Sequence, residues 1–140
     1  MEEGRILAID PGTKRIGLAI SDPLGISAQG LDSLGYEGYE KLAQDLKSLI
    51  AEYSVRKIII GLPLNLNGTS GPKAKEAVEL ADKLKDDFGI PIQTWDERLT
   101  SAQAERIMIQ TDTRRQKRKE LRDKLSAQII LQSYLTANNV

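Results

Sequence analysis

The fold class follows from Arg5 to Ser21, a stretch that reads RILAIDPGTKRIGLAIS. Four consecutive apolar residues precede Asp10, which is typical of a strand buried on both faces. Pro11-Gly12-Thr13 is a turn sequence. Residues 15–21 alternate apolar and small or polar side chains, so we expect them to return antiparallel to the first strand.

Downstream of this hairpin the chain alternates between strand and helix patterns. Apolar residues recur at helical spacing without a gap over residues 39–53, which predicts an amphipathic helix. The other expected elements are a weaker strand over 26–34, a strand over 57–62, a helix over 72–88, a strand over 92–95, a helix from Thr100 that fades near Thr111, and a last helix from about 120 to 137. This order predicts an α/β fold: a mixed five-stranded sheet, with three antiparallel and then parallel strands, and helices on both faces.

Composition narrows the possibilities further. The chain has 140 residues, 40% of them hydrophobic, so we expect a single domain over residues 1–140. The 20 basic and 20 acidic residues balance, so net charge names no partner. No apolar run approaches the roughly 20 residues that span a bilayer, and the N-terminus lacks a signal sequence. We therefore expect a cytoplasmic protein with no membrane contact.

The chain has no cysteine and no histidine. This excludes disulfides, Cys/His zinc sites, cysteine nucleophiles and all histidine-based catalytic arrangements. An enzyme of this composition must rely on carboxylates, lysines, hydroxyls or a metal held by oxygen ligands. Such ligands favour Mg²⁺ and Mn²⁺.

Two acidic positions follow expected strands. Asp10 ends the first strand, where it either caps the Pro-Gly turn or serves a catalytic site. Asp96 and Glu97 end the last strand. The alternative there is a solvated strand end in which Glu97 pairs with Arg98.

Asp123 lies on the last expected helix. At 100° per residue, Ala127, Ile130 and Tyr134 fall within about 40° of it, so Asp123 shares the apolar face of the helix. The alternative is an acid that stabilises the positive N-terminus of the helix, but that role does not require it to face the sheet.

Three converging carboxylates repel one another unless cations neutralise them. Two divalent ions about 3.5–4 Å apart activate a water and stabilise the leaving oxygen in phosphodiester hydrolysis. This chemistry needs neither histidine nor cysteine, so we predict a metal-dependent nuclease with two Mg²⁺ or Mn²⁺ ions, whose candidate metal ligands and catalytic residues are Asp10, Asp123 and one of Asp96 and Glu97. Whether Glu97 or Asp96 completes the site stays open.

Residues 114–124 hold seven basic and two acidic side chains, a local charge of +5. We expect a flexible basic loop that contacts a phosphate backbone; the alternative is a solvated, disordered loop. The expected contacts in this stretch are Arg114, Arg115, Lys117 and Arg118.

Further substrate contacts are expected nearer the acids. Lys14 and Arg15 follow Asp10, although they also suit an ordinary hairpin surface. Arg98 either holds a phosphate or orients Glu97. Asn67 belongs to a polar loop whose N–H groups either meet phosphates or form a plain turn.

Four blocks of the sequence resemble the bacterial YqgF family, whose members are described as pre-16S rRNA nucleases and as Holliday junction resolvases. The blocks are residues 10–22, residues 61–63 with 67–69, residues 96–101, and residues 123–127 with 129–135. The resemblance implies a ribonuclease H-like fold, hydrolysis of structured nucleic acid at Asp10, Glu97 and Asp123, and maturation of the 5′ end of 16S rRNA. Two mild departures are Ser126, where the family usually has alanine, and Arg122, where it usually has a small apolar residue.

The resemblance also implies that one acidic side chain must extend across a neighbouring strand. Junction resolvases of this superfamily carry an acid at the end of the fourth strand, whereas here that strand ends Gly61-Leu62-Pro63. Glu97, after the fifth strand, must substitute. If the fourth strand lies between the first and fifth, Glu97 must span about 10 Å.

Two alternative functions belong to other classes of protein. Asp-x-Gly-Thr also opens the phosphate loop of actin-like ATPases and sugar kinases, but those enzymes need a second domain for which 140 residues leave no room. A non-catalytic RNA-binding module is another alternative. Pre-16S rRNA is favoured over branched DNA only by the resemblance, and a monomer and a homodimer are equally compatible with the sequence.

Overall fold

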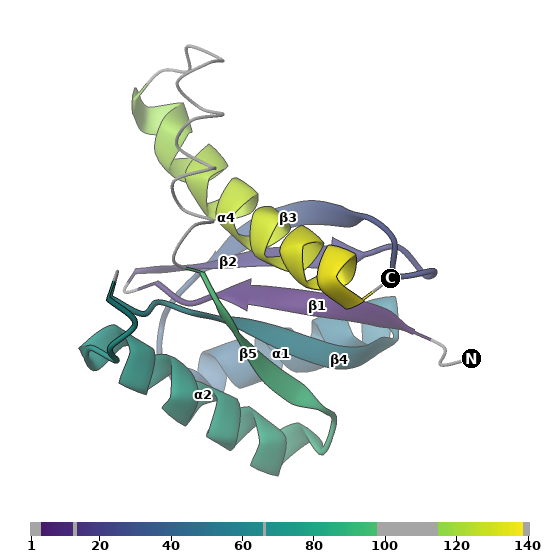
Figure 1. Ribbon diagram of the computed structural model, residues 1–140. Coiled ribbons are helices and arrows are strands. Elements are labelled where there is room, and N and C mark those ends of the chain that lie inside the picture. The colour runs from purple at the N-terminus through teal and green to yellow at the C-terminus, as the bar shows by residue number, and fades with distance from the viewer. Residues whose placement is uncertain (1–3, 13, 66, 98–114, 139–140) are drawn as a thin grey trace.

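Five strands form one sheet at the centre of the fold (Figure 1). The computed structural model describes residues 4–12, 14–65, 67–97 and 115–138, and in the last range it describes side chains from residue 125 onward. In chain order the strands are β1 (Arg5–Asp10), β2 (Arg15–Ser21), β3 (Ala28–Gly35), β4 (Val55–Leu62) and β5 (Ile92–Asp96). Across the sheet their order is β3-β2-β1-β4-β5.

The pairing of the strands confirms the predicted mixed sheet. β2 pairs antiparallel with both β1 and β3. β4 pairs parallel with both β1 and β5. The carboxyl ends of β1, β4 and β5 therefore meet at one edge, and β4 lies between the other two.

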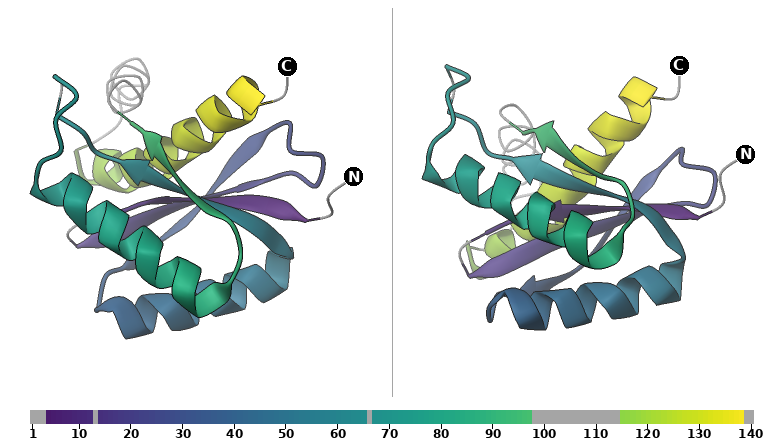
Figure 2. Two further views of the ribbon diagram at one scale, coloured as in Figure 1. Left: turned by 60° about the horizontal axis from the view of Figure 1, so that its bottom comes forward. Right: turned by 90° about the horizontal axis from the view of Figure 1, so that it is seen from below.

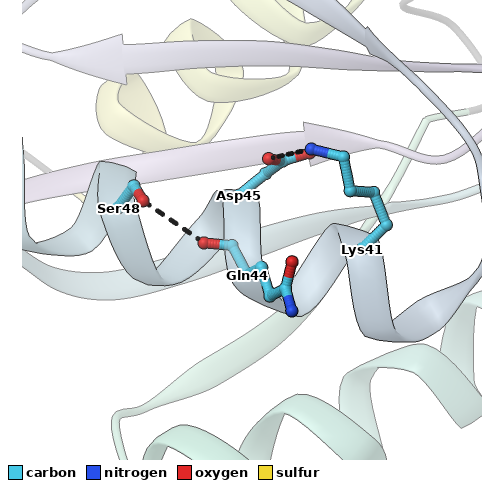
Figure 3. A network of polar contacts seen from close by, with 4 residues as sticks. All are labelled: Lys41, Gln44, Asp45 and Ser48. Carbon is cyan, nitrogen blue, oxygen red and sulfur yellow. Dashed lines mark hydrogen bonds and ion pairs between the residues drawn. The ribbon is translucent and has the colours of Figure 1, made fainter.

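Helices cover both faces of the sheet (Figure 2). α1 (Tyr39–Tyr53) and α2 (Pro72–Phe88) pack on one face, and α4 (Arg115–Asn138) packs on the other. The outer surface of α1 is polar: Lys41 Nζ contacts Asp45 Oδ1 at 2.8 Å, and Ser48 Oγ donates to the Gln44 carbonyl at 3.4 Å (Figure 3). None of the described helices is long and apolar enough to cross a membrane.

β1 sends alternate side chains to the two layers. Leu7 and Ile9 are buried against α1 and α2, whereas Ile6 and Ala8 are buried on the α4 side. Because strand side chains alternate, Asp10 continues the series of Ile6 and Ala8 and lies on the α4 face. The predicted double burial of this strand is confirmed.

Side-chain contacts fix the C-terminal half of α4 on the sheet. Gln132 Oε1 accepts the Ala28 N–H at 3.1 Å, and Gln132 Nε2 donates to the Ile26 carbonyl. Tyr134 meets Trp95 of β5 edge to face, with ring centroids 5.4 Å apart. α4 begins on the side of the molecule where β1, β4 and β5 end (Figure 1).

Most predicted bounds agree with the structure. α1 and α2 span the predicted residues, and Gly89 ends α2 with a left-handed φ of 64°, as glycine does without steric cost. β3 begins at Ala28 rather than Ile26 because Asp22 Oδ1 accepts the N–H groups of Ile26 and Ser27 and holds both in a turn. The helix predicted from Thr100 lies outside the described residues.

The prediction of a flexible basic loop over residues 114–124 was wrong from Arg115 onward, because α4 already begins there. Arginine, lysine, glutamine, glutamate and leucine are all good helix formers, so this charged run extends the helix instead of preceding it. Asp123 therefore lies eight residues after the first residue of α4, and not in its first turn. The field of the helix N-terminus weakens beyond the first turn, so helix capping no longer explains this acid.

Candidate active site

Asp10 ends β1 on the α4 face and is partly buried. Its partner across the β1–β2 ladder is Gly17, which is also buried. Directly opposed residues of an antiparallel pair point to the same face. A glycine there leaves the space beside the Asp10 carboxylate free of a second side chain.

Glu97 approaches Asp10 from the far side of β4. Its backbone N–H donates to the Leu62 carbonyl at 3.2 Å, which continues the β4–β5 ladder by one residue. Its side chain is partly buried and forms a hydrogen bond with Asp10. The Glu97 side chain therefore spans β4 and contacts Asp10, as the sequence analysis required.

Gly61 is the β4 residue over which this reach occurs. A Cβ atom placed on Gly61 would clash with Glu97 Oε2 and would lie 2.8 Å from Ile130 Cδ1. The Glu97 carboxylate thus occupies the volume that a side chain on β4 would fill.

The two carboxyls form one electrostatic unit. Burial, followed by the charge of Asp10, the hydrogen bond with Asp10 and the charge of Asp96, raises the pKa of Glu97 to about 8. A hydrogen bond between two carboxyl groups requires one shared proton, so the pair stays short of full ionisation near neutral pH. A divalent cation replaces such a proton, and two oxygen-rich carboxylates at a strand edge suit a hard cation. The residues present therefore fit a divalent metal.

The other two acids differ in what the structure describes. Asp96 is exposed and its charge adds to the rise in the pKa of Glu97, whereas Glu97 itself forms the hydrogen bond with Asp10. Asp123 lies on α4 one turn before Ala127, which is buried against the sheet, but its side chain lies outside the described set. Among the described side chains, no group of three or more potential metal ligands occurs.

The predicted basic contacts lie around this pair to different extents. Lys14 is exposed in the hairpin that follows Asp10. The Arg15 guanidinium donates to Ser33 Oγ at 2.8 and 2.9 Å. Ser33 belongs to β3, the edge strand at the other end of the sheet from β5, which Glu97 follows. Arg115, Lys117 and Arg118 belong to the first turns of α4. Arg98 and Arg114 lie outside the described residues.

The loop around Asn67 uses its polar groups internally. The Asn65 N–H donates to the Thr69 carbonyl at 2.9 Å, and the Gly68 N–H donates to the Asn65 carbonyl at 2.8 Å. The Thr69 N–H and hydroxyl both donate to Asn67 Oδ1. These contacts favour the plain turn over a loop of N–H groups open to phosphates.

The glycines beside Asp10 escaped the sequence reasoning. Both belong to blocks that resemble the family, residues 61–63 and 10–22, but the sequence analysis assigns neither glycine a role in the site. A usable signal was present in Gly61, because glycine is unfavourable within a buried strand and usually marks a close approach.

Comparison with known proteins identifies the family of this chain. The RuvX family, described as Holliday junction resolvases, matches residues 4–137. Proteins named "Putative pre-16S rRNA nuclease" are 48% identical over 136 residues in Syntrophomonas wolfei, covering 97% of this chain and 96% of that protein, and 45% identical over 141 residues in Listeria monocytogenes, covering 96% and 99%.

Two solved structures share the fold at low sequence identity. Thermus thermophilus RuvC in complex with a Holliday junction substrate has a TM-score of 0.57 at 14% identity, covering 97% of this chain and 96% of that one. The fowlpox virus resolvase in complex with Holliday junction DNA has a TM-score of 0.60 at 12% identity, covering 95% and 97%. These likenesses confirm the ribonuclease H-like sheet and its helices on both faces.

Nucleases of this family imply a divalent metal ion, which the Asp10–Glu97 pair suits, and a nucleic acid substrate. The family match over nearly the whole chain, the close relatives and the fold lead to one assignment. The chain belongs to the RuvX family of the ribonuclease H-like fold and is a nuclease that hydrolyses phosphodiester bonds.

Proposed function

We propose that residues 1–140 form a single nuclease domain that processes the 5′ end of pre-16S rRNA during ribosome biogenesis in the cytoplasm. The observation that carries this proposal is the pair of Asp10 and Glu97, brought together from the ends of β1 and β5 across Gly61. The choice of substrate rests on the names of relatives 44–48% identical to this chain.

In this proposal Asp10, Glu97 and Asp123 hold two Mg²⁺ or Mn²⁺ ions and are the catalytic residues. The metal supplies charge neutralisation at the phosphate and a readily deprotonated water when bound. Asp10 provides a fixed ligand because it ends a strand buried on both faces. Glu97, which is partly buried beside Asp10, provides the second carboxylate.

Basic and polar side chains around the acids hold the substrate backbone. Lys14 lies in the hairpin next to Asp10, and the first turns of α4 carry a dense positive charge on the side where the parallel strands end. Contacts of this kind position phosphates without reading bases. The proposed contacts are Lys14, Arg15, Asn67, Arg98, Arg114, Arg115, Lys117 and Arg118. Among them, Arg15 and Asn67 would have to exchange their present hydrogen bonds with Ser33 and Thr69 for bonds to a phosphate.

A Holliday junction resolvase is the second candidate function, because the family profile carries that description. A non-catalytic RNA-binding module is the third. One assay distinguishes these three functions. A 5′-extended 16S rRNA fragment and a four-way DNA junction are each incubated with the protein and Mg²⁺ or Mn²⁺. We expect cleavage of the RNA and little cleavage of the junction. Junction cleavage alone would favour the resolvase, and binding without cleavage of either substrate would leave only the module.

Asp10→Asn tests the site directly. The amide keeps the shape of the side chain and removes its charge, so we expect cleavage to fall by about 100-fold or more while the melting temperature and RNA binding change little. Asp82→Asn is the matched control, since Asp82 is exposed on α2 at the opposite face. Normal cleavage by Asp10→Asn would show that the site lies elsewhere.

Oligomeric state separates the two nucleases independently. A four-way junction presents two symmetric strands and calls for a homodimer with two sites, whereas one rRNA end requires only a monomer. We expect sedimentation velocity to show a monomer both with and without the RNA fragment. A dimer formed on a four-way junction would favour the resolvase.

A further inference from the structure

Gly61 occupies the position on β4 that lies between the two paired acids. Ile9 of β1 pairs with Ile60, and Gly61 pairs with Trp95 of β5, so Gly61 lies level with the carboxyl end of β1. Ile59, two residues earlier, is buried on the α4 face. Gly61 therefore faces the same side as Asp10 and Glu97.

The backbone at Gly61 does not itself require glycine. Its φ is not among the positive values found at Gly4, Gly25, Gly38, Gly68 and Gly89. Alanine would adopt the same extended conformation, and glycine within a strand is less stable than alanine. The requirement for glycine must therefore come from the groups that pack against position 61 on the α4 face of the sheet.

Two side chains pack against Gly61 on the α4 face, and both lie too close to leave room for a Cβ atom. A Cβ atom would clash with Glu97 Oε2 and would lie 3.4 Å from Glu97 Cδ. The same atom would lie 2.8 Å from Ile130 Cδ1 of α4. One neighbour belongs to the acid pair and the other to the apolar core.

We propose that Gly61 is a positioning residue: its missing side chain provides the passage through which the Glu97 carboxylate crosses β4 to reach Asp10. The proposal rests on the assignment of Asp10 and Glu97 to the site under the proposed function. It explains how this chain places a carboxylate beside Asp10 from β5, although β4 itself ends without an acid.

The competing explanation is packing, in which glycine serves only to accommodate Ile130. The two neighbours allow a separation. Ile130→Val removes Cδ1 and relieves the apolar clash of an alanine at position 61, but it leaves the clash with Glu97 in place. In Gly61→Ala combined with Ile130→Val, we expect the melting temperature to recover while cleavage stays at least about 10-fold below wild type. Recovery of both would overturn the proposal.

A double-mutant cycle with Glu97→Asp tests the same point without a steric clash. Aspartate is one methylene shorter, withdraws from Gly61 and falls short of Asp10. If Gly61 acts through Glu97, Gly61→Ala costs little more activity in the Glu97→Asp background than Glu97→Asp alone. Simple addition of the two losses would show that Gly61 does not act through Glu97.

Two further readouts keep this test separate from the proposed function. Mn²⁺ affinity, measured by electron paramagnetic resonance, should fall in Gly61→Ala and stay unchanged in Gly35→Ala, a control position where a Cβ meets nothing within 4 Å. A crystal structure of metal-free Gly61→Ala should show the Glu97 carboxylate displaced from Asp10. An undisplaced Glu97 would refute the passage even in an active enzyme, whereas full activity of Glu97→Gln would refute only the role of Glu97 in the reaction.

Discussion

At the scale of single residues, the site depends on two carboxyls held closer than two free negative charges favour. Asp10 is fixed by β1, and Glu97 is directed toward it from the end of β5. Their hydrogen bond retains a proton in the absence of a cation. A pair that binds either a proton or a metal is a physical basis for metal dependence.

The raised pKa of Glu97 predicts a pH-dependent stability of the metal-free protein. Its ordinary pKa of 4.5 applies to the unfolded chain, and burial beside Asp10 raises the folded value to about 8. The stabilising contribution of the protonated group is therefore complete below about pH 4.5 and is lost as the pH rises through 8. In EDTA, we expect the wild-type melting temperature to fall by several degrees more than that of Glu97→Gln between pH 5 and 9.

Two controls accompany this measurement. Glu52→Gln removes an exposed glutamate from α1 and should keep the wild-type pH dependence. Saturating Mn²⁺ should raise the wild-type melting temperature most at high pH, where the carboxyls would otherwise repel one another. Parallel pH profiles for wild type and Glu97→Gln would contradict the shared proton.

At the scale of elements, part of the first sequence block serves the fold and not the site. Ser21 is 1% exposed, and its Oγ accepts the Ile6 N–H at 2.8 Å and donates to the Asp22 carbonyl at 3.0 Å. Asp22 in turn accepts the N–H groups of Ile26 and Ser27, which lowers its pKa. These two residues shape the β2–β3 hairpin and join β2 to β1.

Ser21→Ala tests that structural role. Without the hydroxyl, the buried Ile6 N–H loses its acceptor, so we expect a loss of about 1–3 kcal/mol in the free energy of unfolding with the cleavage rate of the folded protein unchanged. Urea denaturation measures the first quantity and a cleavage assay the second. Ser48→Ala on the exposed surface of α1 (Figure 3) is the control and should change stability by less than about 0.5 kcal/mol. A loss of activity without a loss of stability would place Ser21 in the site instead.

α4 is the element whose extent bears most on the proposed substrate contacts. Its first turns contain the basic residues that the sequence analysis assigned to a loop. A helix presents these charges at a fixed spacing, whereas a loop loses conformational entropy when it binds. Positive charge held on a helix is thus better organised for binding a phosphate backbone than charge on a loop.

At the scale of the whole molecule, the net charge is zero. We therefore expect the position of the positive charges, and not their total, to determine the affinity for RNA. Replacing Arg115, Lys117 and Arg118 with glutamine keeps good helix formers in α4 and removes three positive charges. If all three contact phosphates, the slope of log K against log salt concentration should become shallower by about 2 for single-stranded RNA. Fluorescence anisotropy of a labelled RNA fragment, measured between about 50 and 300 mM KCl, gives this slope.

The control for this prediction removes the same charge from the other face. Lys47, Lys75 and Lys85 are exposed on α1 and α2, and their replacement with glutamine should leave the slope nearly unchanged. Equal effects of the two triple variants would mean that total charge, and not the position of α4, governs binding.

Local patterns in the sequence were sufficient to predict most of the secondary-structure elements and the class of chemistry. Apolar periodicity is a local property, so the four strands β1, β2, β4 and β5 and the helices α1 and α2 could be predicted nearly to their ends. The absence of histidine and cysteine likewise restricted the chemistry to oxygen ligands. The end of β1 at Asp10 followed from the apolar run before it.

How the acids meet depends on long-range contacts that the sequence pattern does not contain. Whether Glu97 or Asp96 faces Asp10 depends on the order of three parallel strands, on the face each side chain takes at the end of β5, and on the missing side chain of Gly61 between them. These are contacts between residues 36 to 87 positions apart in the chain, and no local pattern encodes them. The start of α4 at Arg115 was not predicted either, because a charged run has high helix propensity but no apolar period that would indicate a helix.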